Sequence, residues 1–390
     1  MNTTAPPSRG LDRVPEDITD PAWGQSLSNG ALGPALFHLT RATTAPDSAD
    51  TALAWLRAAT RTSVSSHPDG ALFCGVTSLA YVLAITRAGD AELRRRLHTH
   101  VLTLTRKRLH TAHRRLADDA TTTPREYDLI GGLSGLGAYL LTTQPDGDTT
   151  RAVLSYLVAL TEPRHVHGRQ VPGWWTRLSP KGQESPGFVH GHANLGMAHG
   201  IAGPLAVLAT ALHHGVEVPG QVDAIEYIAA WMNIWRHRDD DGVWWPRWIT
   251  WPQYLEQQPV EPNPMRPTWC YGIPGQARAQ HLAALALGRT GRAAESVDAL
   301  AACATDQDRL AALDASLCHG RSGLLQTLRR TAEDEGTGRL DKVVRNLEHQ
   351  VTVRPSTGTG LLEGSSGQAL AHLPAPAHRT RWDTCLLITS

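Results

Sequence analysis

The sequence predicts an all-α protein whose helices form two concentric rings, an α/α toroid of seven inner and seven outer helices with small loop or β insertions over one end. Three observations predict this fold. A short phrase with two glycines three residues apart, G-x-x-G, recurs seven times along the 390 residues. An apolar and nearly uncharged run follows each copy. The intervals between copies contain further segments whose apolar residues have helical spacing.

The seven copies are roughly 45 to 70 residues apart, a spacing typical of a repeat architecture. A glycine at a helix start lets the backbone turn where a side chain would clash, and a second glycine one turn later lets neighbouring helices pack closely. Helices that carry almost no charge should be buried on all sides. The copies, one of which has serine as its second small residue, are Gly30–Gly33, Gly75–Ser78, Gly132–Gly135, Gly200–Gly203, Gly272–Gly275, Gly320–Gly323 and Gly364–Gly367.

The segments between the copies carry Arg, Glu and Asp on one face and apolar residues on the other, so they should form the outer helices. An open solenoid is the alternative to a ring. Burial of all the inner helices on two faces favours the closed ring. The segments with this pattern are 50–59, 91–109, 151–160, 222–235, 293–303 and 338–351.

Two insertions, near 163–192 and 239–267, interrupt the helical pattern. They are rich in Trp, Pro and Gly without a helical period, so we expect loops or short strands. Each precedes a G-x-x-G copy and should lie over the end of the ring where the copies meet. A Trp-rich rim suits an extended peptide ligand, and a plug for the ring is the alternative. Residues 1–20 should form a flexible tail, and residues 21–390 a single toroid domain.

The bulk composition excludes several classes of protein. Hydrophobic residues make up 41% of the chain and charged residues 19%, which fits a globular protein with an ample core. The formal net charge is +0, so nothing in the composition favours nucleic acid or an anionic membrane as a partner. The N-terminus lacks the apolar core of a signal peptide, and no stretch is long and apolar enough to span a bilayer. We therefore expect a cytoplasmic protein with no transmembrane segment.

The cysteines point to a metal site. Five cysteines, an odd number, argue against a disulfide framework. Cys270 and Cys318 both stand two residues before the first glycine of adjacent copies, and His319 follows Cys318. Equivalent loop positions converge in a ring, so these side chains should meet, although Cys318 considered alone would be a core thiol. Two Cys and one His with an open fourth position form a catalytic type of zinc site, and we predict one Zn²⁺ per chain.

A histidine and a carboxylate should face the same cavity. His199 stands one residue before a first glycine, the position that His319 occupies in its own copy. It would act there as a fourth ligand or as a general acid or base. Asp128 precedes its first glycine by four residues and would orient and tune His199. A helix N-cap is the alternative role for Asp128.

Two further polar residues flank Cys270. Arg266 and Tyr271 would stabilise an oxyanion or donate a proton, and a solvated loop charge is the alternative for Arg266. The remaining cysteines should have structural roles. Cys303 and Cys385 should be buried, and Cys74 is more consistent with the core than with the cavity. Four histidines without a counterpart in another copy should lie at the surface, namely His190, His192, His213 and His214.

The ligand set indicates the chemistry. Zinc with two thiolate ligands is a weak activator of water but suits the binding of a third thiol, whose pKa it lowers while the bound thiolate stays nucleophilic. The sequence therefore predicts thiol activation, by alkylation or conjugate addition. Addition to an α,β-unsaturated amide creates an enolate, which needs a cation and an acid. Arg266 and His199 would fill these roles.

Four stretches resemble the lanthionine synthetase C-like family, the lanthipeptide cyclases. They are Asp128–Gly135 (DLIGGLSG), Asn194–Gly203 (NLGMAHGIAG), Arg266–Gly275 (RPTWCYGIPG) and Ser316–Gly320 (SLCHG), and the similarity extends through the seven repeats. The family is a zinc-containing α/α toroid that adds peptide Cys thiols to dehydroalanine or dehydrobutyrine, which forms lanthionine and methyllanthionine thioether rings.

By this resemblance Cys270, Cys318 and His319 bind zinc, and His199, Asp128, Arg266 and Tyr271 line the active site. The chain shows no kinase or dehydratase region at its N-terminus, so it resembles a stand-alone class I cyclase. The partners implied are a dehydrated precursor peptide with leader and core, a separate dehydratase, and a transporter in the same complex, through which the protein would associate with the membrane.

Three other functions compete with this one. A member of the same superfamily would add glutathione to dehydrated protein sites. A non-catalytic peptide-binding scaffold would lack zinc, against which the complete Cys and His set argues. A glycoside-processing toroid would need paired acids in the cavity, where the G-x-x-G loops offer only Asp128 and Glu363.

Overall fold

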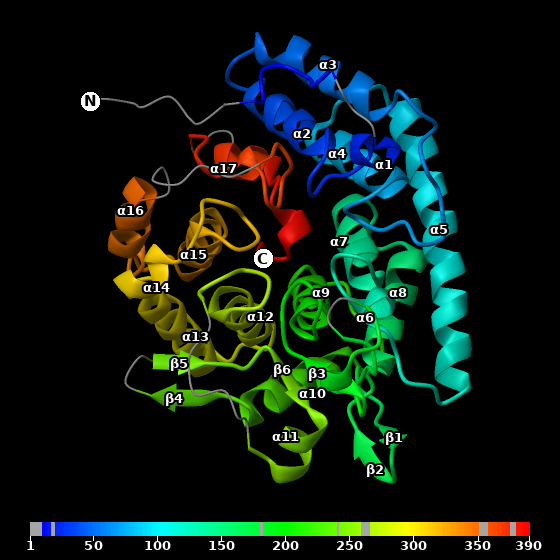
Figure 1. The fold of residues 1–390 in the computed structure, drawn as a ribbon, viewed down its shortest axis with the longest axis vertical. Coiled ribbons are helices and arrows are strands. Elements are labelled where there is room, and N and C mark those ends of the chain that lie inside the picture. Colours follow the sequence, from blue (N-terminus) through cyan, green and yellow to red (C-terminus); the bar gives the residue numbers. More distant parts are fainter. Residues whose placement is uncertain are drawn as a thin grey trace.

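Seven inner helices stand around a common centre in the computed structural model, which describes residues 10–16, 20–179, 182–239, 242–258, 266–350, 358–374 and 380–390 (Figure 1). Each begins at a G-x-x-G copy, and the last packs against the first, so the ring is closed and the predicted toroid is confirmed. The inner helices are α2 (Leu32–Arg41), α4 (Val76–Thr86), α7 (Leu133–Thr143), α9 (Ala202–His213), α12 (Ile273–Ala286), α15 (Arg321–Glu335) and α17 (Ser365–Ala371).

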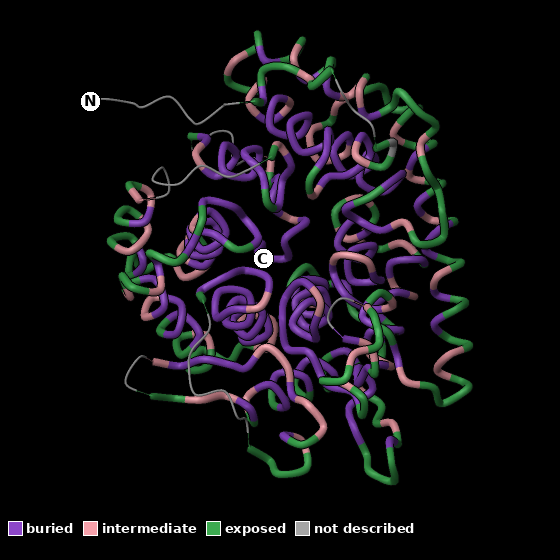
Figure 2. Tube along the Cα trace, in the orientation of Figure 1, coloured by how far each residue is buried: buried purple, intermediate pink, exposed green. Residues whose placement is uncertain are grey.

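Six outer helices surround this ring in the described residues, and each lies where amphipathic spacing predicts it. Figure 2 shows the contrast between the buried inner ring and the exposed outer surface. Within the described part of the chain, no helix is both long and apolar enough to cross a membrane. The outer helices are α3 (Ser48–Ala59), α5 (Ala91–Ala117), α8 (Asp148–Ala159), α10 (Gln221–Ile234), α13 (Thr290–Cys303) and α16 (Asp341–Gln350).

The C-terminal segment differs from the regular pattern of inner and outer helices. The described residues after α17, 380–390, form no seventh outer helix but run into the centre of the ring (Figure 1). Trp269 Nε1 donates a hydrogen bond to the carbonyl of Leu386 at 3.0 Å. Asp383 is fully buried and forms an ion pair with Arg330 at 2.6 Å. Buried apolar side chains such as Trp382 and Ile388, together with this pair, anchor the segment inside the ring.

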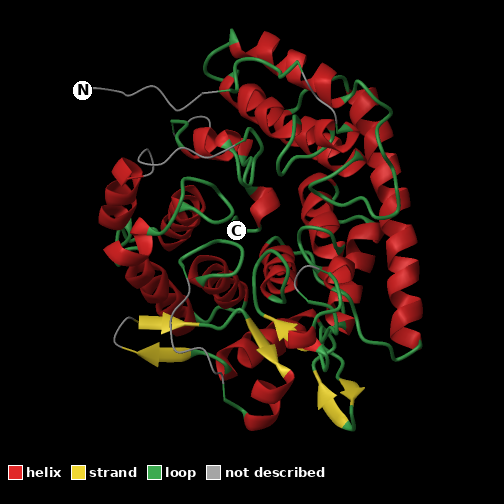
Figure 3. Ribbon diagram, viewed as in Figure 1, coloured by secondary structure: helices red, strands yellow, loops and turns green. Residues whose placement is uncertain are grey.

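The two insertions pair with each other through short strands (Figure 3). Strand β3 (His192–Asn194) is antiparallel to β6 (Trp248–Thr250), so the stretches before copies four and five form one layer. Two separate hairpins flank it, and the helix α11 (Trp251–Glu256) follows β6. The other strands are β1 (Arg164–Val166), β2 (Arg169–Val171), β4 (His237–Asp239) and β5 (Gly242–Trp244).

Parts of four predicted segments are not covered: the tail, the two insertions and the last outer segment. The residues outside the described part are 1–9 and 17–19 of the tail, 180–181 of the first insertion, 240–241 and 259–265 of the second, and 351 of the outer segment. Five short helical segments complete the described part of the fold. They are α1 (Pro21–Gly24), α6 (Pro124–Tyr127), α14 (Gln307–Ala311) and the 3₁₀ turns η1 (Pro186–Phe188) and η4 (Thr384–Leu386).

The second glycine of each copy is needed where the inner helix folds back onto its own loop. A Cβ on Gly323 would lie 1.9 Å from the carbonyl oxygen of Leu317 and 3.3 Å from Cβ of Trp269, which belongs to the neighbouring copy. Copy two takes serine instead, and the Ser78 hydroxyl donates to the carbonyls of Gln25 and Gly75.

Gly323→Ala should therefore destabilise the fold by about 3 kcal/mol, because the new methyl group meets backbone that must move. Urea unfolding followed by circular dichroism measures the change. Gly291→Ala is the matched control: nothing lies within 4 Å of a Cβ there, so it should raise stability by about 0.5 kcal/mol. Equal stability of the two variants would contradict this account of the repeat.

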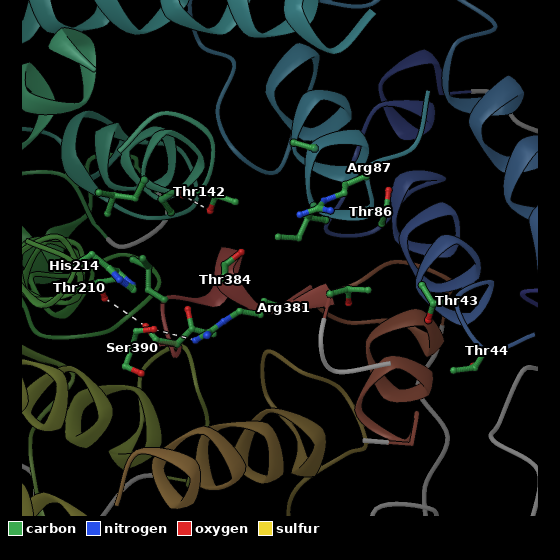
Figure 4. Close-up of a pocket in the computed structure, with 17 residues that line it drawn as sticks. Thr43, Thr44, Thr86, Arg87, Thr142, Thr210, His214, Arg381, Thr384 and Ser390 are labelled. Atoms are coloured by element: carbon green, nitrogen blue, oxygen red, sulfur yellow. Dashed lines mark hydrogen bonds between the residues drawn. The ribbon is translucent and has the colours of Figure 1, made fainter. Parts of the chain in front are cut away.

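A cavity of about 830 Å³ opens at the end of the ring opposite the G-x-x-G loops (Figure 4). The C-terminal ends of α2, α4, α7 and α9 and the segment 380–390 line it, mainly with threonines. It contains none of the predicted site residues.

Candidate active site at the N-terminal ends of the inner helices

Neighbouring G-x-x-G loops are joined by backbone hydrogen bonds around the ring. The amide of Ala198 donates to the carbonyl of Cys270 at 3.2 Å, and the amide of Cys270 donates to the carbonyl of Cys318 at 3.4 Å. The amide of Cys318 donates to Leu362 at 2.8 Å, and that of Leu362 to Ser28 at 2.8 Å. All these residues stand two positions before the first glycine of their copies. Equivalent positions therefore converge, as the register of the repeats predicts.

Cys270, Cys318 and His319 form a group that could hold a metal ion. Their ligand atoms all lie within 4.8 Å of one another. Sγ of Cys318 and Nε2 of His319 are 3.7 Å apart. Tetrahedral zinc, with bonds of about 2.3 Å to sulfur and about 2.0 Å to nitrogen, separates its ligand atoms by roughly 3.5 to 3.8 Å. The two cysteines are buried and the histidine is exposed, so the group opens to one side.

That open side is a cavity of about 220 Å³. Its walls come almost entirely from the two positions that precede the first glycine in successive copies. The lining residues are Ser28, Asn29, Ile130, Ala198, His199, Cys270, Tyr271, Cys318, His319, Leu362 and Glu363.

His199 and Asp128 form a pair at the edge of this cavity. His199 Nδ1 lies 2.8 Å from Asp128 Oδ2, although 71 residues separate them in sequence. The Asp128 side chain is only 2% exposed, whereas that of His199 is 32% exposed. The other oxygen of Asp128 accepts a hydrogen bond from the amide of Gly131 at 2.7 Å. Asp128 is therefore held by its own loop and orients His199, and it is not the N-cap of α7, which is Gly132.

Tyr271 and Arg266 occupy different environments. The Tyr271 ring stacks on that of His199 with centroids 5.9 Å apart, and Trp248 meets it edge-on at 6.1 Å. Strand β6 of the second insertion, which begins at Trp248, thus contacts the wall of the cavity through Tyr271. Arg266 lies in the same loop with an exposed side chain and is not among the residues that line the cavity.

The charges of the cavity are coupled. The hydrogen bond between the two cysteines lowers the pKa of Cys270, and His319 lowers it further. The same hydrogen bond raises the pKa of Cys318. Burial lowers the pKa of His199, but the hydrogen bond with Asp128 and its negative charge outweigh burial, so the pKa of His199 is raised. These interactions therefore favour the thiolate at Cys270 and the imidazolium at His199.

Two polar groups beside the cysteines were not among the predicted site residues, although the sequence already placed the carboxylate of Glu363 in a G-x-x-G loop. Glu363 Oε1 lies 3.7 Å from Nδ1 of His319, whereas the other imidazole nitrogen, Nε2, faces Cys318. Thr268 Oγ1 lies 3.7 Å from Sγ of Cys270. Glu363 precedes its first glycine by one residue, so the register that identified His199 also identifies this carboxylate.

Two predictions about burial were wrong. His192 is fully buried in β3 and not at the surface, because β3 is covered by its pairing with β6 and by the Phe188 ring, 4.5 Å away. Cys74 is exposed and not in the core; it lies in the loop before α4, next to Gly75, whose φ of +74° is in the left-handed region. Cys303 and Cys385 are buried, as predicted.

The chain matches one family of known proteins over most of its length. The family described as lanthionine synthetase C-like protein matches residues 21–387. The chain belongs to this family. The resemblance of the four motifs is thereby confirmed, and the match includes every residue of the cavity.

Two known proteins are similar to this chain, one in sequence and one in structure. The nisin biosynthesis protein NisC of Lactococcus lactis subsp. lactis is 25% identical over 276 residues. The alignment covers 68% of this chain and 65% of that protein. A solved structure of nisin cyclase has a TM-score of 0.79 with 21% identity, and the match covers 94% of this chain and 93% of that one. The second comparison supports the fold.

Proposed function

We propose that this protein is a zinc-dependent lanthipeptide cyclase, which adds peptide Cys thiols to dehydroalanine or dehydrobutyrine to form lanthionine and methyllanthionine rings. The observation that carries the proposal is the convergence of two cysteines and a histidine from adjacent loops in one cavity with the His199–Asp128 pair. The family membership and the similarity to a nisin biosynthesis protein support the same reaction.

Cys270, Cys318 and His319 would hold one zinc ion, since the donor set and spacing fit a three-ligand site with an open position. When bound, zinc lowers the pKa of the substrate thiol so that a nucleophilic thiolate exists at neutral pH. The hydroxyl of Thr268 would stabilise the Cys270 thiolate by hydrogen bonding.

In the reaction, the substrate sulfur bonds to the β-carbon of the dehydro residue, and the electron pair of the carbon–carbon double bond moves toward the carbonyl as an enolate. His199, protonated because Asp128 raises its pKa, donates the proton to the α-carbon. Asp128 is a positioning residue that fixes the tautomer of His199. Arg266 and Tyr271 would stabilise the enolate charge. The proton that the substrate thiol releases on ionisation returns through solvent to His199, so the net change is addition of S–H across the double bond.

The test uses a synthetic peptide that contains one Cys and one dehydroalanine. Cyclisation leaves the mass unchanged, so the free thiol is counted by alkylation with N-ethylmaleimide and mass spectrometry. With zinc-loaded protein, the alkylated species should disappear much faster than in buffer alone. Tandem mass spectra of the product should lack fragments from cleavage inside the thioether ring. Alkylation at the uncatalysed rate with fully loaded, folded protein would overturn the proposal.

A second arm separates the glutathione-adding alternative. The same peptide with its Cys replaced by Ser is incubated with glutathione. A cyclase should leave it unmodified, whereas a glutathione-adding protein would increase its mass by one glutathione. A substrate of this kind requires dehydrated Ser or Thr, so a separate dehydratase would act before this protein, and the transporter expected from the resemblance would act after it.

Glu363→Gln should weaken zinc binding by about tenfold, because metal-bound histidines are held by a partner on their second nitrogen. Here that partner is the Glu363 carboxylate, 3.7 Å from Nδ1 of His319. Competition with a chromogenic chelator measures the affinity. Glu256→Gln, which changes an exposed acid at the end of α11, should leave the affinity unchanged. Equal affinities of the two variants would show that Glu363 does not support the ligand.

A further inference from the structure

The outer helix α5 carries a concentration of positive charge that the proposed reaction does not use. Its 27 residues contain eight Arg or Lys side chains and one carboxylate, a formal net charge of +7, and four histidines in addition. The whole chain has a formal net charge of +0, so the rest of it carries a net negative charge. The helix forms the outer edge of the toroid beside α4, α7 and α8 (Figure 1).

The cations of α5 fall into two sets. Five are tied to neighbouring groups: Arg94 to the carbonyls after α4, Arg95 to Glu92, Arg106 to Thr149, Arg108 to the carbonyls of Gly70 and Arg125, and Arg115 to Glu126. Four of these contacts hold the helix against the ring, whereas the pair of Arg95 with Glu92 lies within α5 itself.

The second set forms an exposed stripe. Arg96, Lys107 and Arg114 have no side-chain hydrogen bond or ion pair within the described part of the chain, and all three are exposed. With His100 and His110 they follow one another at helical spacings of three, four or seven residues, so they share one face. The stripe is about 27 Å long at 1.5 Å per residue. The only carboxylate of α5, Glu92, precedes the stripe, so no acidic residue of the helix lies between these cations.

The stripe borders a groove of about 760 Å³ between α5, the loop before copy two, and α6. Four Arg or Lys side chains line it, against two carboxylates. One of these, Glu126, is already paired with Arg115 at 2.6 Å. The groove therefore presents a net positive wall.

The groove ends next to the candidate active site. Arg125 lines it, and Cγ of Arg125 would lie 3.4 Å from a Cβ on Gly131. Gly131 also neighbours Asp128, whose Oδ1 would lie 3.6 Å from the same Cβ. A chain that lies in the groove thus reaches the loop that positions His199.

We infer that this groove and the exposed stripe of α5 bind an acidic segment of the peptide substrate, outside the residues that form the rings. The identity of the occupant rests on the proposed function. Charge complementarity selects an acidic ligand, and the concave shape selects an extended chain. No Trp, Tyr or Phe lines the groove for base stacking, and the stripe has no apolar side chain for insertion into a lipid surface.

The test measures binding without catalysis. A fluorescein-labelled glutamate-rich peptide is titrated with the protein and followed by anisotropy, beside a glutamine-rich peptide of equal length. The double variant Lys107→Glu with Arg114→Glu should bind about tenfold more weakly. The matched control is Lys342→Glu with Arg345→Glu, which makes the same charge change on exposed residues of α16, across the ring (Figure 1). Its affinity should stay within about twofold of the wild type.

Binding of the glutamate-rich peptide should weaken steeply with salt, since the Debye length falls from about 10 Å at 0.1 M to about 3 Å at 1 M ionic strength. Equal loss in both double variants, or equal binding of the glutamine-rich peptide, would overturn the inference. Sedimentation with phosphatidylserine vesicles is the other arm. Vesicle binding that depends on α5, without peptide binding, would also overturn it and assign the surface to a membrane.

The single change Arg96→Glu serves if the double variant does not fold, and it should weaken binding by about threefold. Neither readout requires zinc or turnover. A protein that binds the acidic peptide through α5 but forms no thioether therefore refutes the proposed reaction and not the groove. A protein that forms thioethers but gives the same affinity in all variants refutes the groove alone.

Discussion

Cys318→Ala should remove the bound zinc and slow thioether formation about a thousandfold while the toroid stays folded. The loss corresponds to several kcal/mol of activation free energy, the contribution expected of a metal that activates the nucleophile. The variant keeps Cys270 and His319, but two ligands do not hold zinc in a stable tetrahedral site. The backbone bonds of Cys318 with Cys270 and Leu362 do not depend on its side chain, so the ring of loops should survive.

Elemental analysis of the purified protein and the alkylation assay together measure this prediction. Cys303→Ala is the matched control, because it also removes a buried free thiol but lies at the end of α13, away from the cavity. It should retain about one zinc per chain and full activity. Full zinc content in the Cys318 variant would refute the ligand assignment, and loss of both zinc and helical circular dichroism would show a structural role instead.

The register of the repeats explains why the site could be predicted from sequence. The loops are copies of one unit, and in a closed ring copies meet at equivalent atoms. Cys270 and Cys318 share a position two residues before the first glycine, and the structure joins those residues by a direct backbone hydrogen bond. His199 and His319 share the next position and line one cavity. Periodicity therefore fixed both the elements and their convergence.

Features without a repeat partner could not be predicted in this way. The segment 380–390 has no helical period, and its place in the centre of the ring depends on long-range pairs such as Arg330 with Asp383. The burial of His192 depends on the pairing of β3 with β6 across the intervening α9 and α10. Such contacts arise from tertiary packing, which local spacing does not encode. Arg266 remains a prediction, because its side chain is exposed and is not among the residues that line the cavity.

His199→Ala should lower the rate of thioether formation by two to four orders of magnitude, about the contribution of a positioned general acid, with zinc retained. The retained zinc distinguishes this loss of activity from that of Cys318→Ala, since His199 is not one of the three converging ligands. His213→Ala is the control. It removes an exposed histidine at the C-terminal end of α9, the helix that follows the loop of His199. A His199 variant that loses zinc would instead assign His199 as the fourth ligand.

The pH profile tests the role of Asp128. His199 must be protonated to donate, and its pKa is raised above the usual 6.5, so the rate should hold above that pH and fall as the pH rises through the raised value. Asp128→Asn removes the negative charge 2.8 Å from Nδ1, and burial of His199 then lowers its pKa. The descending limb should move to lower pH, by about one unit or more. A limb that stays in place while the rate drops at every pH would show that Asp128 only fixes the ring, and that a different group supplies the proton.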